Sequence, residues 1–416
     1  MRDGFFKNIF FLLGLIFFLF PSWGSSTLPL KKNEEGNFST DILVRADLQQ
    51  GLELPTKSMM RNSYTAQNDL GDYAFSFMTL IKGKWLSALW YKGNDQKKGR
   101  ILHIASEEMI LSDPSMNQKG DVVFSEFSLS GIKDVFVYTK RTMALSRPLK
   151  NYVDIIQRGS HFQINDEGLI LFRSGRSNDG QSIYCLGKDL LIEKLSQRKE
   201  QGLSYLFGPK LVGAKGFLVK VREGEPGEWE EKRPDSIRFY SFQEGDQGPL
   251  VLHEDKDSDS ASLFERFDNS MAASPDGKWI AFIGYLKDGK RALVRQKLGE
   301  TFTIISKEGV EGVKKIEFFS PSINDLGHIA FRGIGDDGKR HIYFAGLNTM
   351  SIILSEKQKV SLNQGEGVIF APEGPSFGGQ ATLNNKNQVL VRGRVFKIKG
   401  QVDLGQALFR VQGPKY

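Results

Sequence analysis

The segment Gly374-Pro375-Ser376-Phe377-Gly378 is the part of the sequence that most resembles a catalytic motif. It matches the Gly-x-Ser-x-Gly pattern, which places a serine nucleophile on a sharp turn of a hydrolase. Those hydrolases need a histidine base after the serine, and the last histidine here is His341. The 40 residues that follow Ser376 in this 416-residue chain are also too few for the rest of such a fold. We therefore interpret the segment as a glycine-rich loop and predict no catalytic residue.

A second candidate is an acidic segment with the spacing of a calcium loop. Asp255, Asp257 and Asp259 alternate with other residues, and Ca²⁺ takes several oxygen ligands from one short segment. However, Ser260 stands where the turn glycine of such a loop belongs, and Arg266 stands where a bidentate glutamate belongs. We prefer the interpretation of a solvated loop and keep calcium as the alternative; no other cofactor is predicted.

The histidines and the cysteine show no metal-binding spacing. The five histidines fall in different parts of the chain: His103, His161, His253, His328 and His341. None forms a His-x-His or Cys-His pattern, which a zinc site would favour. The single Cys185 lies in an apolar stretch and cannot form an intramolecular disulfide, so we interpret it as a small buried hydrophobic residue.

The first 24 residues have the pattern of a secretory signal peptide. Arg2 and Lys7 precede an apolar run from Ile9 to Phe20, and small residues follow it. The run is shorter than the roughly 20 residues that a spanning helix requires. We therefore expect a periplasmic or secreted protein with no membrane span after cleavage. The net charge of +7 comes from intermixed acidic and basic residues, which argues against nucleic acid as a partner.

The remainder, residues 25–416, is organised by an internal repeat with a turn residue in each copy. The turn residues are Gly71, Gly120, Gly168, Gly216, Gly277, Gly327 and Asn387, at spacings of 49, 48, 48, 61, 50 and 60 residues. A period near 50 is typical of the four-stranded blades of a β-propeller. A β-sandwich would instead need about seven strands within roughly 100 residues. The sequence therefore predicts one all-β domain, a seven-bladed β-propeller.

Each copy contains short strand-like runs after its turn, and Asp-Gly pairs such as Asp288-Gly289 predict hairpins between the second and third strands. The predicted fourth strands are 101–106, 153–157, 190–195, 250–253, 302–306 and 351–355. The seventh copy ends after its third strand. We expect the N-terminal segment Asp41–Asp47 to supply the missing strand, which would close the ring and remove exposed sheet edges.

Three copies carry the residues of a family resemblance. The segment Ser274-Pro275-Asp276-Gly277-Lys278-Trp279-Ile280-Ala281-Phe282, with Asp288-Gly289 after it, resembles the WD40-like repeat of TolB-type bacterial propellers. The segments Asn324-Asp325-Leu326-Gly327-His328-Ile329-Ala330-Phe331 and Ile164-Asn165-Asp166-Glu167-Gly168 resemble the Asn-Asp-x-Gly repeats of secreted bacterial propellers. The resemblance implies a propeller fold. TolB has an α/β domain before its propeller, and the segment before the first repeat is too short for one here, so the partners of TolB are not carried over.

The two longer spacings predict enlarged loops around His253–Asn269 and Ser361–Gly379. Insertions in repeat proteins often lie on one binding face. The aromatic residues of these loops are Phe264, Phe267, Phe370 and Phe377. They are candidates for contact with a ligand, and the alternative is that they pack on the ring. The leading hypothesis is a non-enzymatic platform that binds a protein partner, or a glycan, in the envelope or extracellular space. The alternative is a hydrolase or lyase of a polysaccharide, with carboxylates or histidines clustered at one mouth of the channel.

Overall fold

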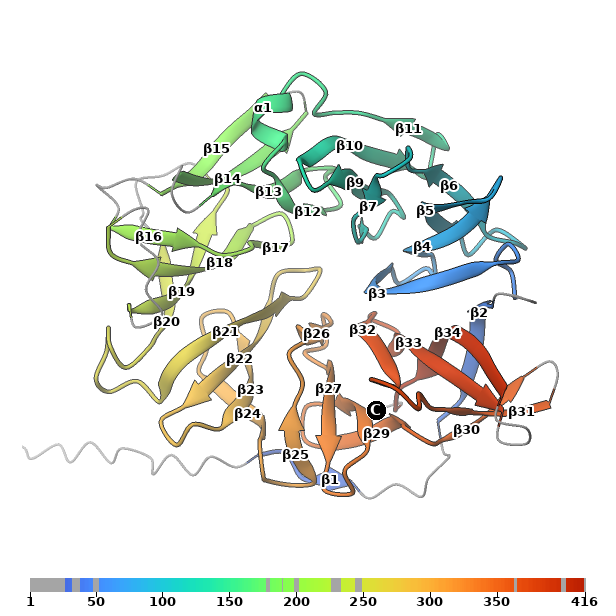
Figure 1. The fold of residues 1–416 in the computed structure, drawn as a ribbon. Coiled ribbons are helices and arrows are strands. Elements are labelled where there is room, and N and C mark those ends of the chain that lie inside the picture. The colour runs from blue at the N-terminus through green and yellow to red at the C-terminus, as the bar shows by residue number, and fades with distance from the viewer. Residues whose placement is uncertain are drawn as a thin grey trace, which may run out of the picture.

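The computed structural model describes residues 27–31, 38–47, 52–176, 180–188, 190–197, 202–225, 233–243, 249–362, 365–397 and 402–414. They form seven β-sheets that follow one another in chain order around a single axis (Figure 1). The protein is therefore a seven-bladed β-propeller, as the repeat predicted. The predicted signal peptide lies outside the described residues. In the described part of the chain, no helix has the length and apolar character needed to cross a membrane.

The first three blades contain the first three copies of the repeat. Blade one consists of β3 (Ser58–Gln67), β4 (Tyr73–Ile81), β5 (Lys84–Lys92) and β6 (Arg100–Ile104). Blade two consists of β7 (Ile110–Leu111), β8 (Ser115–Met116), β9 (Val122–Ser128), β10 (Gly131–Thr139) and β11 (Ala144–Ser146). Helix α1 (Val153–Ile156) leads to blade three, which consists of β12 (Ser160–Ile164), β13 (Ile170–Arg176), β14 (Gly180–Gly187) and β15 (Leu190–Ser196).

The next three blades continue the ring. Blade four consists of β16 (Leu203–Leu206), β17 (Lys210–Val212), β18 (Gly216–Glu223), β19 (Asp235–Ser241) and β20 (Leu250–Glu254). Blade five consists of β21 (Phe264–Ala273), β22 (Trp279–Leu286), β23 (Arg291–Lys297) and β24 (Phe302–Lys307). Blade six consists of β25 (Val313–Ile316), β26 (Ser322–Ile323), β27 (Ile329–Gly335), β28 (Arg340–Ala345) and β29 (Met350–Ser355).

Blade seven joins the two ends of the chain. Its C-terminal strands are β30 (Lys359–Leu362), β31 (Gly365–Ile369), β32 (Phe377–Leu383), β33 (Gln388–Lys397) and β34 (Val402–Gln412). The N-terminal β2 (Thr40–Ala46) pairs antiparallel with β34 and completes the blade (Figure 1). The predicted closing strand is confirmed. The sequence did not indicate β1 (Leu30–Lys31), which adds a parallel strand to β29 at the outer edge of blade six.

The second strands explain why the apolar runs are continuous. In β4, Phe75 and Phe77 pack on blade seven, whereas Ala74, which precedes Phe75, packs on blade two. In β18, Phe217 packs on blade three and Leu218 on blade five. A strand covered on both faces needs apolar side chains at successive positions rather than at alternate ones. Similar clusters fill all seven contacts between neighbouring blades.

The repeat turns join the first and second strands of each blade. Six of the seven predicted turn residues have a left-handed backbone: Gly71, Gly120, Gly168, Gly277, Gly327 and Asn387. Glycine and asparagine adopt this conformation at low cost. The exception is Gly216, which begins β18. In blade four the left-handed turn residue is Gly213, with φ of +54°.

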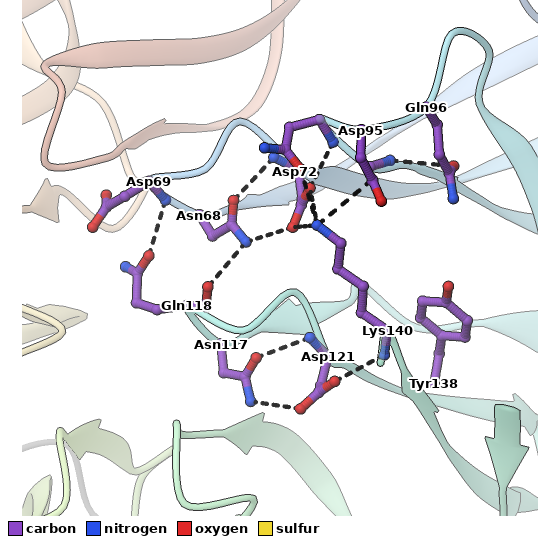
Figure 2. Close-up of polar contacts among 12 residues, drawn as sticks. Asn68, Asp69, Asp72, Asp95, Gln96, Asn117, Gln118, Asp121, Tyr138 and Lys140 are labelled. Carbon is purple, nitrogen blue, oxygen red and sulfur yellow. Dashed lines mark hydrogen bonds and ion pairs between the residues drawn. The ribbon is translucent and has the colours of Figure 1, made fainter. Parts of the chain in front are cut away.

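The turns between the first and second strands of the blades lie at one end of the channel, and we call these turns the belt. Their side chains link neighbouring blades. In blade one, Asn68 Oδ1 accepts the N–H of Asp72 at 2.9 Å, while its Nδ2 donates to the carbonyl of Gln118 in blade two at 3.3 Å. The N–H of Asp69 donates to Gln118 Oε1 at 2.9 Å (Figure 2). Lys140 Nζ, from the turn that follows the third strand of blade two, donates to both carboxylate oxygens of Asp72 at 2.9 Å.

The belt continues around most of the ring. Asn117 donates to the carbonyl of Asn165 at 3.0 Å, and Asn324 donates to the carbonyl of Asn384 at 3.0 Å. Asn384 donates in turn to the carbonyl of Asn68 at 3.1 Å, which joins blade seven to blade one. The Asn-Asp-x-Gly pattern is therefore structural: its first residue shapes its own turn and holds the next blade.

Two predicted elements are wrong. The segment 153–157 is not a fourth strand but contains helix α1, because the spacing of Leu149, Tyr152 and Ile156 directs all three side chains into the cluster between blades two and three. The fourth strand of blade two is β11 instead. The enlarged segment Ser361–Gly379 is not one long loop, since β30 and β31 form a hairpin and β31 pairs with β33.

Candidate functional site

A cavity of about 800 Å³ occupies the central channel. Six of the seven blades contribute to its wall, through residues that include Tyr64, Asp113, His161, Lys210, Ser322 and Gln380. The β9–β10 turn and the segment between α1 and β12 also line it, through Leu129–Ile132 and Gln157–Gly159. Strand β9 begins beside the belt and ends at this turn. The lining therefore reaches the mouth of the channel that lies opposite the belt.

All seven first strands of the blades are interrupted, and the interruptions shape the channel wall. Bulges occur in β3, β12 and β21, while the other four first strands are divided into pairs of short strands. The divided strands are β7/β8, β16/β17, β25/β26 and β31/β32. A bulge changes the direction of its side chains and commonly lies near a functional site. Tyr64, Asp113 and His161 lie at such interruptions and line the cavity.

His161 has the most unusual conformation on this wall. Its φ of +59° lies in the left-handed region, which is uncommon for a residue other than glycine and is found most often at functional sites. Its Nδ1 lies 3.0 Å from Ser160 Oγ, and its ring covers Gly208, where a Cβ atom would lie 2.5 Å from the ring. His161 is exposed to the channel, and its desolvation by the surrounding wall, followed by the charges of Arg173 and Lys210, lowers its pKa to about 4. The imidazole is therefore neutral at neutral pH.

Lys210 lies beside His161 and gives this side of the wall a positive charge. It is the first residue of β17, and its backbone pairs with Leu218. Among the described residues, no hydrogen bond or ion pair involves its Nζ. Burial lowers the pKa of Lys210. Arg158 adds a second cationic side chain at the mouth, and Asp113 is the one carboxylate of the described lining.

The rim of the mouth is apolar next to this charged wall. Leu129 is fully exposed at the tip of the β9–β10 hairpin. Phe127 and Ile132, which flank the same tip, are half-buried and line the cavity. A cavity mouth that combines exposed apolar side chains with a few polar groups is typical of a binding site.

The four predicted aromatic binding residues lie away from this cavity. Phe264, Phe267 and Phe377 are buried in the clusters of blade five and blade seven. Phe370 is half-buried and packs against Phe396, with ring centroids 6.1 Å apart. In this structure the aromatic residues of the two enlarged segments pack on the ring, which is the second of the two alternatives considered from the sequence.

The candidate calcium ligands do not point toward a common centre. Asp255 is buried, and its Oδ1 accepts the N–H groups of Asp257 and Ser258 at 3.1 and 3.2 Å. Its Oδ2 accepts the N–H of Asp235 at 2.7 Å. Asp259 accepts the N–H of Ala261 at 2.9 Å. These carboxylates stabilise the turn, and within the described ranges no group of three His, Cys, Asp or Glu residues is placed to hold a metal ion.

The serine of the Gly-x-Ser-x-Gly segment also has a structural role. Ser376 is buried, its Oγ donates to Glu356 Oε1 at 2.6 Å, and the same oxygen accepts the N–H of Ala371 at 3.2 Å. These contacts hold the connection between β31 and β32. The buried Cys185 has its pKa raised to about 12 by burial.

The other four histidines each have a partner inside or between blades. His103 contacts Glu126 at 3.1 Å, and His253 contacts Gln296 at 2.9 Å. His328 Nδ1 lies 2.9 Å from Asn387 Oδ1, and His341 Nδ1 lies 2.9 Å from Ser355 Oγ. His161 is the one histidine of the described channel lining.

The buried His253 should lower the free energy of unfolding in acid. Burial lowers its pKa to about 4, whereas an unfolded histidine has a pKa of about 6.5. The unfolded chain therefore binds the proton more tightly, so the free energy of unfolding falls as the pH decreases from about 6.5 toward 4. This histidine contributes a loss of about 2 kcal/mol at about pH 5. Urea unfolding at pH 7.5 and 5 measures the loss.

A His253→Gln variant provides the control for this prediction. It removes the titrating group, so the difference in unfolding free energy between the two pH values should shrink relative to the unsubstituted protein. Equal differences for the two proteins would contradict the assignment.

The sequence contained little indication of the residues that line the channel. An Asp-Gly turn or an alternating strand marks regular structure, whereas Tyr64, His161 and Lys210 lie at or beside strand interruptions. One signal was present in the sequence. Pro114 and Pro209 lie in the first-strand regions of blades two and four, and proline interrupts a strand ladder.

Comparisons with known proteins support the fold. No protein-family model matches the sequence, and no curated protein matches it. The structure is similar to the β-propeller domain of the Trilobed protease from Pyrococcus furiosus, with a TM-score of 0.55 and 12% identity, over 87% of this chain and 97% of that one. It is also similar to oligogalacturonate lyase from Vibrio parahaemolyticus, with a TM-score of 0.51 and 11% identity, over 91% of this chain and 97% of the lyase.

TolB from Acinetobacter baumannii is also among the matched structures, with a TM-score of 0.44 and 12% identity, over 68% of this chain and 64% of TolB. The Pyrococcus propeller has an open velcro topology, whereas β2 pairs with β34 and closes the ring here. The sheet topology and these structural similarities together show the fold, a seven-bladed β-propeller.

Proposed function

We propose that this protein is an exported, non-enzymatic β-propeller that binds a segment of a protein partner in the mouth of its central channel. The observation that carries the proposal is the cavity of about 800 Å³, whose rim presents Leu129 and whose wall holds polar side chains such as His161 and Lys210. This proposal keeps the hypothesis of a binding platform from the sequence, but it places the binding face at the channel mouth rather than on the two enlarged segments.

The size of the cavity favours a segment rather than a folded domain. Cavities of roughly 300–1,000 Å³ enclose drug-sized ligands, and a few residues of an extended peptide have a comparable volume. Apolar side chains of that segment would contact Leu129, Phe127 and Ile132, and its polar groups would meet the wall further inside. The rest of the partner would lie over the face that carries the β9–β10 turn.

An exported location is part of the proposal. Residues 1–24 have the charged start, apolar core and small-residue exit of a cleaved signal peptide. The mature chain would then function in the periplasm or outside the cell, and its partner would be an envelope or extracellular protein.

The lining does not favour the alternative of a polysaccharide hydrolase or lyase. A glycosidase uses two carboxyl groups about 5–9.5 Å apart. The described lining offers one carboxylate, Asp113, and one histidine, His161, from different blades. A glycan therefore remains the competing ligand in the binding experiment rather than a second proposed function.

Substitution of Leu129 tests the proposal. Leu129 is fully exposed, so Leu129→Asp should leave the fold intact and place a charge on the apolar rim. We expect affinity capture from envelope extract with the mature protein to retain a partner that the variant loses. Leu326→Asp is the matched control, because Leu326 is an exposed leucine of the belt at the opposite end of the channel.

The variants also define the contradictory results. A partner lost equally with both variants, or with neither, would contradict binding at the mouth. A glycan array in which the mature protein binds and Leu129→Asp does not would replace the protein partner by a glycan at the same site.

A further inference from the structure

Lys210 is the feature of the channel wall that points most directly to the chemistry of a ligand. It is half-buried and lines the cavity, and in the described structure its ammonium group has no hydrogen-bonding or ion-pairing partner. Removing a cation from water without a compensating anion costs free energy. Lys220, a fully buried lysine of blade four, shows how such a charge is usually paired, since its Nζ contacts Asp235 at 3.1 Å and the carbonyl of Phe267 at 3.0 Å.

The surroundings of Lys210 favour an anion at this wall. His161 lies close enough for the charge of Lys210 to act on it, and Arg173 acts on it as well. Arg173 NH1 donates to the carbonyl of Leu206 at 2.7 Å, so this guanidinium is held in blade three beside blade four. Asp113, the one carboxylate of the described lining, comes from blade two. The pKa of Tyr64 in blade one is raised by desolvation and, to a smaller extent, by the charge of Asp113. Asp113 therefore lies toward blade one rather than toward Lys210.

His161 can supply a second contact to the same anion. A neutral imidazole has one N–H donor and one acceptor. Its Nδ1 faces Ser160 Oγ, and within the described part of the chain its Nε2 has no hydrogen-bond partner. If Ser160 donates its hydroxyl proton to Nδ1, Nε2 carries the proton and donates to a ligand. The left-handed backbone holds the ring in this position over Gly208.

We propose that the wall formed by Lys210 and His161 recognises a carboxylate of the bound segment, so that the partner presents an acidic peptide to the channel. This inference rests on the proposed function, because it assumes that a peptide enters the mouth. Lys210 supplies the charge, His161 supplies an N–H donor, and the apolar rim contacts the neighbouring side chains of the peptide. The carboxylate belongs either to an aspartate or glutamate side chain or to the C-terminus of the segment.

Selection from random peptide libraries tests the inference without knowledge of the partner. One phage library displays linear peptides fused at both ends, and a second displays peptides with a free C-terminus. We expect selection on the full mature protein, with Leu129→Asp as counter-selection, to enrich Asp or Glu at one position or to enrich the free C-terminus. The library that yields binders distinguishes the two sources of the carboxylate.

Substitutions then assign the contact. We expect Lys210→Met to weaken binding of a selected synthetic peptide at least about tenfold, as is typical when one partner of an enclosed ion pair is removed. Lys210→Arg should keep most of the affinity. Lys314→Met, at an exposed lysine of β25 away from the cavity, is the matched control and should bind like the unsubstituted protein.

A change in the peptide, measured with both proteins, completes a double-mutant cycle. Its effect on the unsubstituted protein does not depend on the folding of any variant. Replacing its carboxylate by the amide should weaken binding to the unsubstituted protein as much as Lys210→Met does, and should have little further effect on Lys210→Met. Peptides that bind at the mouth without any carboxylate dependence would overturn this inference and leave the proposed function standing. Failure to select any peptide that Leu129→Asp loses would overturn both.

Discussion

Removal of β2 is expected to lower the melting temperature of the propeller by about 6–10 °C. This strand pairs with β34 from Thr40↔Val411 to Ala46↔Gln406. Its Val44 and Ala46 are buried in the cluster between blade seven and blade one. The ladder hydrogen bonds contribute about 0.5–1.5 kcal/mol each, and a buried valine about 1.5–3 kcal/mol. A loss of about 5–8 kcal/mol corresponds to this shift for a chain of this length.

The exposed edge should also change how the protein associates. Without β2, the N–H and C=O groups of β34 would face solvent, and unpaired edges promote aggregation. Calorimetry and light scattering on a mature protein that begins at residue 52 measure both effects.

A less severe truncation, which begins at Phe38, is the matched control. It removes β1, with its pairs Leu30↔Met350 and Lys31↔Ser351, and the buried Leu28 beside it, but it keeps β2. We expect this control to retain most of the stability. A protein that begins at residue 52 and melts like the control would show that β2 does not close the ring.

Asp235→Ala is expected to lower the free energy of unfolding by about 3–5 kcal/mol, because it leaves two buried cations without their partner. Asp235 is buried in blade four, where Arg222 Nε and NH2 donate to its two oxygens at 2.7 and 3.0 Å. Lys220 Nζ donates to Oδ2 at 3.1 Å and lies 3.7 Å from the ring centroid of Phe207.

The same residue helps to position the start of the acidic segment. The N–H of Asp235 donates to the buried Asp255, so the network connects the third strand of blade four to the turn after its fourth strand. Denaturant unfolding of Asp235→Ala measures the loss.

An exposed ion pair provides the comparison. Lys84 Nζ and Glu107 Oε2 lie 2.7 Å apart, and their side chains are 61% and 63% exposed. Glu107→Ala should change the free energy of unfolding by less than about 1 kcal/mol. A triple variant, Asp235→Leu with Lys220→Met and Arg222→Leu, should recover part of the loss, because no buried charge remains unpaired. Similar losses for Asp235→Ala and Glu107→Ala would contradict the role given to burial.

The ring was predictable because its information is local and repeated. The left-handed turn at Gly71 or Gly327 needs a glycine, and the spacing of such residues indicated the blade length and number. The closing strand was predictable for a different reason. The last blade lacked a strand, and the segment Asp41–Asp47 contained the strand-like run Ile42-Leu43-Val44 and belonged to no repeat.

The binding candidates were harder to place because length alone does not show where a side chain points. The long spacing around His253–Asn269 is absorbed by the turn at Asp255 and by the bulged β21, whose Phe264 and Phe267 fill the core of blade five. Deleting Ser361–Gly379, which the sequence suggested as a loop, would remove β31 and the buried Phe377 and would disrupt blade seven.

The channel wall could not be predicted because it depends on contacts between different blades. His161 and Lys210 are separated by 49 residues, and neither belongs to a recognisable motif. The packing of blade three against blade four brings their strands, β12 and β17, side by side (Figure 1). The bulge that places His161 in the channel is a property of the pairing between β12 and β13, which a single strand does not reveal.

Binding at the channel mouth is best measured by site-specific photo-crosslinking in intact cells. A photoreactive phenylalanine analogue would replace Leu129 at the rim or Leu326 in the belt, on opposite ends of the blades. We predict one protein adduct from position 129, absent from position 326 and weakened by Lys210→Met. An adduct from position 326 alone, or no protein adduct from position 129, would contradict binding at the mouth.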